Sequence, residues 1–270
     1  MTAFVNHFAF EFKTGLRNQT QMLMNYLFPL AFYALMGLVM TQINPDFKET
    51  LLPAMIIFAV LVSTLLGMPG PLVEAREAGI FRSFKINGVP ALSILAIPAL
   101  TTIFHALIVS ALIALTASSL FGGAAPVDWG SFVLVALVTA FACGGLGALI
   151  GFIATGSRST VLWSQLIFLP SMLIGGLMLP VSLLPESIRP ASALLPSTHA
   201  MQAFLGLAYR QETSIDPLAS FLILAVNGIL AFGLAIYLFN WDSRNDARRG
   251  HSLMALLVVV PYLAGIFFLK

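Results

Sequence analysis

Long apolar runs separated by short polar segments dominate this chain. A helix needs about 20 predominantly apolar residues to cross a hydrocarbon core about 30 Å thick. Seven runs approach or exceed this length, and they predict membrane-spanning helices at residues 22–41, 51–73, 91–117, 131–154, 161–180, 218–240 and 253–269. The pattern therefore predicts an all-α polytopic membrane protein in which residues 1–270 form a single transmembrane domain.

An amphipathic stretch, residues 1–20, comes before the first apolar run. Apolar residues recur there at every fourth position, and polar residues occupy another face of the same predicted helix. The apolar set is Phe4, Phe8, Phe12 and Leu16, and the polar set is His7, Glu11, Thr14 and Asn18. Such a pattern is typical of a helix that lies in the membrane interface, so we expect an N-terminal interfacial elbow helix.

The connection at residues 181–217 is interrupted by prolines and is also unusually apolar. Pro180, Pro185, Pro190 and Pro196 break it into short pieces, while the apolar residues between them argue against a freely solvated loop. Short helices that re-enter the membrane from outside account for both features, provided that their non-helical backbone is buried in protein or faces a watery cavity. A plain external loop is the alternative.

Residues 74–90 concentrate charge between two apolar runs. Of the 13 basic and 11 acidic residues in the chain, five fall within 12 positions here: Glu74, Arg76, Glu77, Arg82 and Lys85. Each of these charges would cost about 2.5–3.5 kcal/mol at the centre of a bilayer. The segment is therefore expected to project into water.

The basic residues predict the orientation of the chain. If the N-terminus is cytoplasmic, nine basic residues fall inside and four fall outside, which satisfies the positive-inside rule. The inside set is Lys13, Arg17, Arg76, Arg82, Lys85, Arg158, Arg244, Arg248 and Arg249, and the outside set is Lys48, Arg189, Arg210 and Lys270. Residues 74–90 are then cytoplasmic and residues 181–217 external. The net charge of +2 is too small and too dispersed to indicate a nucleic-acid partner.

Catalytic chemistry is not indicated by any motif. A phosphate-binding loop ends in Gly-Lys-Ser/Thr, and no lysine of this chain follows a glycine, so the chain is not expected to bind ATP by that route. The four histidines lie in separate segments without a partner acid or cysteine at ligand spacing. We expect no enzyme activity, no metal site and no cofactor on this chain.

Three polar residues within predicted spans are candidates for a transport pathway or for helix packing. His105 is a proton or substrate contact in the first interpretation and a neutral imidazole bonded to a neighbouring helix in the second. Gln165 and Asn227 carry the same two interpretations. Gly147 and Gly151 form a Gly-x-x-x-Gly pair that favours close approach of two helices.

Two stretches resemble one family. The sequence EAREAGIFRSFKINGVP, residues 74–90, resembles the cytoplasmic loop of ABC transporter type-2 membrane permeases. The sequence from Leu179 to Tyr209, LPVSLLPESIRPASALLPSTHAMQAFLGLAY, resembles the external re-entrant signature of that family. The residues that match the first are Glu74, Arg76, Glu77, Gly79, Arg82 and Lys85, and those that match the second are Pro185, Leu195, Pro196 and Thr198.

The resemblance implies the membrane subunit of a dimeric ATP-driven exporter. Residues 74–90 would couple to a separate soluble ATP-binding subunit, which binds ATP and Mg, and a second permease subunit would complete a homodimer or heterodimer in membrane lipid. Family members commonly have six spans, so residues 253–269 would be a seventh, C-terminal one. The expected location is a cell membrane, the inner membrane of a bacterium or archaeon.

The sequence and the resemblance thus favour an exporter of a lipophilic or amphipathic substrate, such as a drug, antibiotic, lipid or peptide, with a lipid-linked glycan as an alternative. Two other classes stay open. An ion-coupled secondary transporter is one, although the acidic residues lie at span edges or in loops. A non-transporting membrane assembly factor is the other, and its charged loop would have no ATPase to contact.

Overall fold

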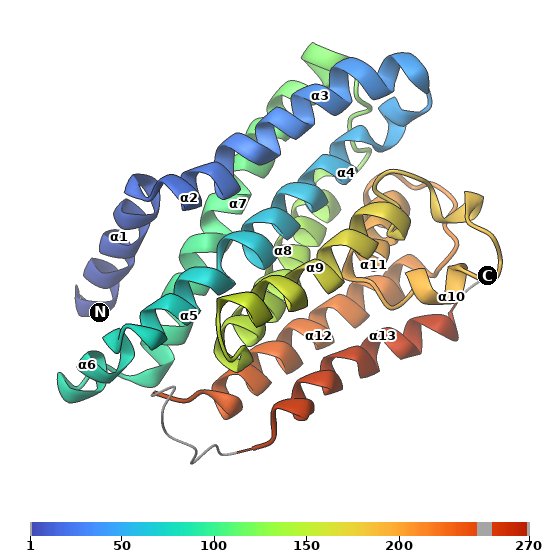
Figure 1. Cartoon of the computed structure of the whole chain (residues 1–270). Coiled ribbons are helices and arrows are strands. Elements are labelled where there is room, and N and C mark those ends of the chain that lie inside the picture. Colours follow the sequence, from blue (N-terminus) through green and yellow to red (C-terminus); the bar gives the residue numbers. More distant parts are fainter. Residues whose placement is uncertain (1, 242–249, 269–270) are drawn as a thin grey trace.

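The computed structural model describes residues 2–241 and 250–268. Helices make up most of these two ranges, and neither range contains a β-strand. The expected all-α fold is therefore confirmed. The helices run roughly parallel or antiparallel in one elongated bundle (Figure 1).

Thirteen α-helices and five short π or 3₁₀ segments, labelled η, are described. The α-helices are α1 (Thr2–Arg17), α2 (Gln19–Met22), α3 (Phe28–Ile43), α4 (Phe47–Leu61), α5 (Pro69–Glu77), α6 (Ile80–Ile86), α7 (Ala91–Phe121), α8 (Trp129–Ile153), α9 (Ser157–Ile174), α10 (Arg189–Ser192), α11 (Pro196–Ala203), α12 (Pro217–Leu238) and α13 (Val259–Ile266). The η segments are η1 (Leu23–Leu27), η2 (Val62–Gly67), η3 (Val181–Leu183), η4 (Phe204–Ala208) and η5 (Ser252–Val258).

Five continuous helices are long and apolar enough to cross a membrane, counted over the described residues. They correspond to five of the predicted spans, and two of them include η segments: η1 in Gln19–Ile43, and η2 followed by a bend at Met68 in Phe47–Glu77. These five helices are Gln19–Ile43, Phe47–Glu77, Ala91–Phe121, Trp129–Ile153 and Pro217–Leu238. The chain is thus a multi-pass membrane protein.

The predicted span at 161–180 differs from the observed helix. Helix α9 begins at Ser157 and ends at Ile174, before two glycines. Gly176 has a left-handed φ of 89°, which helices do not continue through. A Cβ on Gly175 would collide with the Ser197 Oγ atom of α11, so the chain turns where α11 approaches it closely. The apolar run continues past this turn, which is why hydropathy extended the predicted span too far.

The predicted seventh span at 253–269 also differs in form. Residues Ser252–Ile266 make a shorter apolar helix, in which η5 leads into α13. Pro261 lies within α13, and residues 269 and 270 fall outside the described part of the chain. The helix runs beside α12 and back toward α10 (Figure 1). A count of six or seven crossings stays a prediction.

Helix α4 forms the centre of the core. All but three of its residues are buried, and it packs against α3, α7, α8 and α11. Helix α8 supplies a second buried face, along which it packs closely on α12 and η2. A Cβ on Gly147 would lie 2.0 Å from the Thr64 carbonyl oxygen, so the helices approach at backbone distance there. The predicted close approach at this glycine is confirmed.

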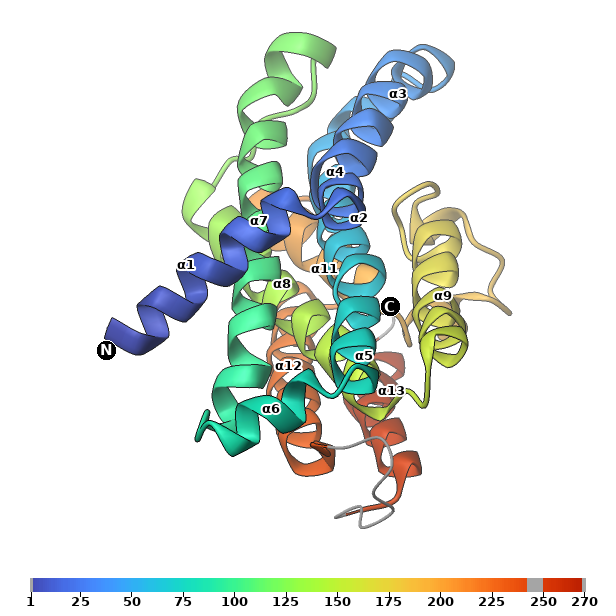
Figure 2. The same cartoon turned by 60° about the vertical axis from the view of Figure 1, so that its left-hand side comes forward.

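The two ends of the bundle carry different connections (Figures 1 and 2). One end has α6, the α8–α9 connection and the end of α12. The other has the α3–α4 turn and the segments 122–128 and 208–216. Backbone hydrogen bonds join the latter group: Ala124 N donates to Lys48 O at 2.9 Å, and Val127 N donates to Ala208 O at 2.9 Å.

Helix α1 leans away from the bundle toward its N-terminal end (Figure 2). Phe8 and Phe12 pack edge-on against Phe104 of α7, and Phe12 also stacks on His105 at 4.4 Å between ring centroids. The expected helix is present, and its position in a membrane interface stays a prediction. The two faces differ from expectation, because His7 and Glu11 turn toward the bundle while Phe4 and Phe10 are exposed.

Candidate functional site

The predicted coupling segment forms a helical corner at one end of the bundle. The long helix Phe47–Glu77 ends there, and Gly79 turns the chain with φ 75°. Helix α6 follows, and Gly88 turns the chain again with φ 72° before α7 begins. Left-handed backbone strongly favours glycine, so the two glycines set α6 across the ends of α5 and α7.

Four of the predicted coupling side chains lie on the surface of this corner. Glu74 and Glu77 are exposed on α5, and Arg82 and Lys85 are exposed on α6. Both signs of charge are therefore presented on a short helical surface. Charged residues at the rim of an interface steer association and select partners.

Arg76 is the exception, because its side chain is buried with 6% exposure. Its guanidinium donates hydrogen bonds to the Phe152 carbonyl oxygen at 2.6 Å and to the Ala154 carbonyl oxygen. These carbonyls lie at the C-terminal end of α8, where helical carbonyls have no partner within the helix. Arg76 thus ties α5 to the end of α8, and its part in coupling stays a prediction.

Aromatic contacts hold α6 in place. Phe81 is buried and packs against Phe152 of α8 and Phe239 beyond α12, at 6.1 and 6.0 Å between ring centroids. Phe84 contacts His7 of α1 edge-on at 5.9 Å. Helix α6 is thereby tied to α8, to α12 and to the N-terminal helix.

Two apolar residues complete the exposed surface of α6. Ile86 is 78% exposed and Ile80 is 44% exposed, so both present large apolar side chains beside the charges. The sequence did not predict these two residues as part of the surface, because the prediction used only the charged residues and Gly79. The sequence did contain an indication of their exposure. Ile80, Phe81 and Ile86 point in different directions from a helix of seven residues, so they cannot all face the core. Apolar residues surrounded by charge are typical of a protein–protein contact surface.

The predicted external signature forms η3, α10 and α11, so the plain-loop alternative is wrong for this segment. Pro196 starts α11, whose eight residues are all buried, and Thr198 is fully enclosed. Leu195 precedes it in extended conformation, and Pro185 is exposed in the turn before α10. Whether these short helices enter the membrane stays a prediction.

Side-chain hydrogen bonds anchor α11 on both sides. Ser197 Oγ donates to the Ser171 carbonyl oxygen of α9 at 3.1 Å, and Gln202 Oε1 accepts from the Ser214 amide at 2.8 Å. His199 Nε2 lies 2.7 Å from the Ala193 carbonyl oxygen. The signature residues therefore build a buried helix that fixes the connection between α9 and α12.

The three polar candidates inside the bundle do not form one site. His105 Nδ1 lies 2.6 Å from the Tyr26 hydroxyl of η1, and Asn227 Nδ2 donates to the Val258 carbonyl oxygen of η5 at 2.6 Å. Gln165 lies on α9, and its Oε1 atom is buried without a hydrogen-bond partner in the described ranges. The contacts of His105 and Asn227 match the helix-packing interpretation.

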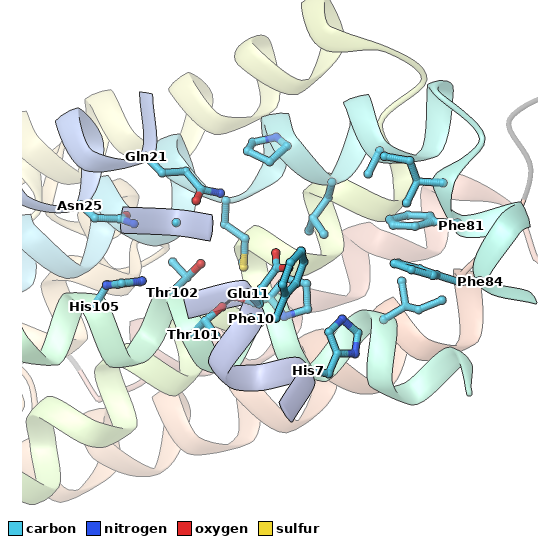
Figure 3. A pocket seen from close by; sticks show the side chains of 18 residues that line it. His7, Phe10, Glu11, Gln21, Asn25, Phe81, Phe84, Thr101, Thr102 and His105 are labelled. Atoms are coloured by element: carbon cyan, nitrogen blue, oxygen red, sulfur yellow. Dashed lines mark hydrogen bonds between the residues drawn. The ribbon is translucent and has the colours of Figure 1, made fainter. Parts of the chain in front are cut away.

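A cavity of about 240 Å³ lies between α1, α2, η1, α5, α6 and α7. His105, Asn25, Gln21 and Thr102 line one part of it, while Phe81 and Phe84 of α6 line the other part (Figure 3). Glu11 lies between these two groups. Burial raises the pKa of the Glu11 carboxyl, an effect that the nearby His7 partly opposes. The sequence reasoning did not predict this cavity.

Fold and site define a helical multi-pass membrane protein that carries a corner with exposed charged and apolar residues at one end of its bundle. The described residues contain no cluster of His, Cys, Asp or Glu fit to hold a metal ion. The chain matches the family described as ABC-2 type transporter over residues 2–209, and it belongs to that family. It is thus the permease part of an ABC transporter, and membership of this family implies partnership with an ATP-binding ABC subunit. No curated protein and no solved structure matches this chain.

Proposed function

We propose that this permease is an exporter subunit that moves a lipophilic or amphipathic substrate outward. The energy comes from ATP hydrolysed by a separate subunit, which docks on the corner formed by α5 and α6. A second permease subunit, identical or related, completes the complex in the inner membrane of a bacterium or archaeon. The N-terminus and α6 lie on the cytoplasmic side.

The observation that carries this proposal is the construction of the corner. Its outer face presents Glu77, Arg82 and Ile86, while its inner face is fixed by Arg76 and Phe81. A surface that transmits a movement needs both a contact face and a rigid connection to the moving helices. Force on α6 would reach α8 through the hydrogen bonds of Arg76 and the packing of Phe81 on Phe152.

Substrate class is proposed from the spans. The five described helices that qualify as spans carry Asp, Glu, Lys or Arg only near the ends of Phe47–Glu77. A small ion would require charged or strongly polar ligands within the membrane. Apolar and aromatic spans favour a substrate that partitions into lipid.

Charge reversal at the corner tests the proposal. In the reconstituted complex with its ATP-binding subunit, Glu77→Lys combined with Arg82→Glu should lower substrate-stimulated ATP hydrolysis by about tenfold, because two rim contacts become repulsive. Glu49→Lys combined with Lys48→Glu makes a matched reversal at the opposite end and should leave hydrolysis unchanged. Equal hydrolysis in both double variants would sink the docking proposal.

The energy source of transport distinguishes an ATP-driven exporter from an ion-coupled transporter. Export from vesicles should persist when the proton gradient is collapsed and ATP is supplied, and it should stop when ATP is withdrawn. The opposite dependence would show a secondary transporter. An assembly factor that transports nothing would give ATP-independent complexes and no export in either condition.

A further inference from the structure

The cavity beside α1 has a chemistry that the coupling role does not use. Among the described residues, Glu11 is the only Asp, Glu, Lys or Arg that lines it. The carboxylate is partly buried, and burial disfavours its charged form. The nearest titratable neighbour is His7, one turn earlier on α1, and His105 faces the cavity from α7. An ionised Glu11 in this position has no fixed cation to balance it among the lining residues.

Two deeply buried polar atoms also lie at this cavity without partners. Asn25 Oδ1 and His105 Nε2 make no hydrogen bond to any described residue, and their side chains are only 4% and 3% exposed. A buried acceptor left unpaired costs about 1–3 kcal/mol. Both atoms are enclosed by protein, so they make this wall polar without opening into the cavity themselves. A space of about 240 Å³ far exceeds the room one water needs.

The remaining wall is apolar and aromatic. Met68, Leu72, Phe81 and Ile94 line it, and they come from α5, α6, α7 and the turn before α5. Figure 3 shows Glu11 between the polar group around His105 and the rings of Phe81 and Phe84. An occupant that satisfies both parts is polar at one end and apolar at the other. Aromatic faces also attract cations.

From this arrangement we propose that the cavity is a binding site for a protonated amine carried on an apolar body. The ammonium group would pair with Glu11, since an ammonium has three donors and no acceptor. The apolar body would lie against Leu72 and Phe81. The ligand would therefore touch the elbow helix and the coupling helix at once. The site holds whether or not the chain exports that amine.

Photolabelling tests this site without any ATPase subunit. The full chain in nanodiscs of phosphatidylcholine is exposed to a diazirine-bearing dodecylamine, and labelled residues are identified by mass spectrometry. We expect label on the stretch from Met68 to Phe84. The same chain length with a terminal alcohol should label this stretch about tenfold less, because a neutral hydroxyl can donate a hydrogen bond to the carboxylate but cannot form an ion pair with it.

Variants identify the pairing group. Glu11→Gln keeps the side-chain shape and should reduce amine labelling by about tenfold, whereas Glu49→Gln at the opposite end should not change it. Equal labelling by the amine and the alcohol, or unchanged labelling in Glu11→Gln, would overturn the proposal.

The source of the amine is resolved by lipid composition. Nanodiscs that contain phosphatidylethanolamine should show reduced labelling if an aminophospholipid headgroup occupies the cavity, because headgroup and probe then compete. Unchanged labelling means that the site takes free amphipathic amines in preference to the lipid. Both results require an amine site, and neither depends on coupling to ATP.

Discussion

Arg76 belongs to a charged cluster in the sequence but lies inside the protein. Its hydrogen bonds to the carbonyl oxygens of Phe152 and Ala154 make it a structural clamp between α5 and α8. The sequence places it between Glu74 and Glu77, and nothing in that pattern distinguishes an inward arginine from an outward one. Burial depends on the distant end of α8, which only the fold brings near.

Replacing Arg76 should therefore affect stability before it affects docking. Arg76→Gln removes charge-assisted hydrogen bonds and should lower the free energy of unfolding by about 1.5–3 kcal/mol. Arg158→Gln changes an exposed arginine near the same end and should cost less than about 0.5 kcal/mol. Thermal unfolding of both variants in detergent gives the comparison, and equal losses would contradict the clamp.

Glu11 predicts a pH dependence whose sign follows from burial. Its pKa is raised in the folded protein, so the stabilising contribution is complete below the ordinary value of 4.5 and is lost as the pH rises through the raised pKa. Glu11→Gln cannot ionise. Its melting temperature in detergent should exceed that of the natural chain at about pH 7.5, and the difference should shrink toward about pH 4.5.

The charged and titratable neighbours of Glu11 define the control for that experiment. His7 on the same helix and His105 on α7 also line the cavity, but both are present in the natural chain and in the variant. Glu49→Gln, at an exposed acid, should show a difference that is constant over the same pH range. If the difference in melting temperature for Glu11→Gln is also constant, burial does not raise the pKa of the Glu11 carboxyl.

Helix packing in this bundle should depend on the glycine at position 147 and not on the glycine at position 233. Gly147→Ala would place a methyl group 2.0 Å from the Thr64 carbonyl oxygen, and a backbone atom of η2 cannot move aside without shifting the helix. We expect a loss of about 1–3 kcal/mol in the free energy of unfolding. Gly233→Ala on α12 meets no atom within 4 Å and should be neutral or stabilising by up to about 1 kcal/mol.

Thermal unfolding of these two glycine variants provides the measurement. Both changes add one methyl group to a membrane-spanning helix, so hydropathy alone predicts similar effects. A similar melting temperature for Gly147→Ala and Gly233→Ala would contradict the close approach of α8 and η2.

The final helix, Ser252–Ile266, has a topology that a reporter can measure. Three arginines just before it, Arg244, Arg248 and Arg249, favour a cytoplasmic start, and its described end lies beside the Ala193 carbonyl and His199 of the external signature. We expect a reporter that is active only outside to give signal when fused after Lys270 and none when fused after Arg249. Cytoplasmic reporting at both points would indicate six crossings.

Several elements were predictable from periodicity and hydropathy because their signals are local. Five apolar runs became helices close to the predicted bounds, and the phenylalanines at every fourth position became α1. The end of α9 was misplaced because Gly175 and Gly176 act through contact with α11, while hydropathy continues past them. The sequence did not predict that Glu11 and His7 line a cavity, because no local sequence pattern indicates a cavity beside a helix.

At the scale of the whole molecule, the two ends of the bundle have different proposed roles. One end would bind the ATP-binding subunit on the cytoplasmic side, and the other would face the exterior. Helix α6 and the ends of α8 and α12 form the end that would receive the ATP-binding subunit. The other end joins the α3–α4 turn to segments 122–128 and 208–216 by backbone hydrogen bonds. The sequence predicted both ends from charge distribution and family resemblance. The rigid connections that join α6 to the bundle required the structure.

Cysteine cross-linking tests the docking claim most directly, because the one native cysteine, Cys143, is buried. Ile86→Cys places a thiol at the exposed end of α6, and Ile43→Cys places one on an equally exposed isoleucine, 72% exposed, at the opposite end of the bundle. With a lysine-and-thiol-reactive reagent, the account predicts a covalent product between the ATP-binding subunit and the chain carrying Ile86→Cys, and none with Ile43→Cys. A product from Ile43→Cys, or none from Ile86→Cys in an assembled complex, would contradict it.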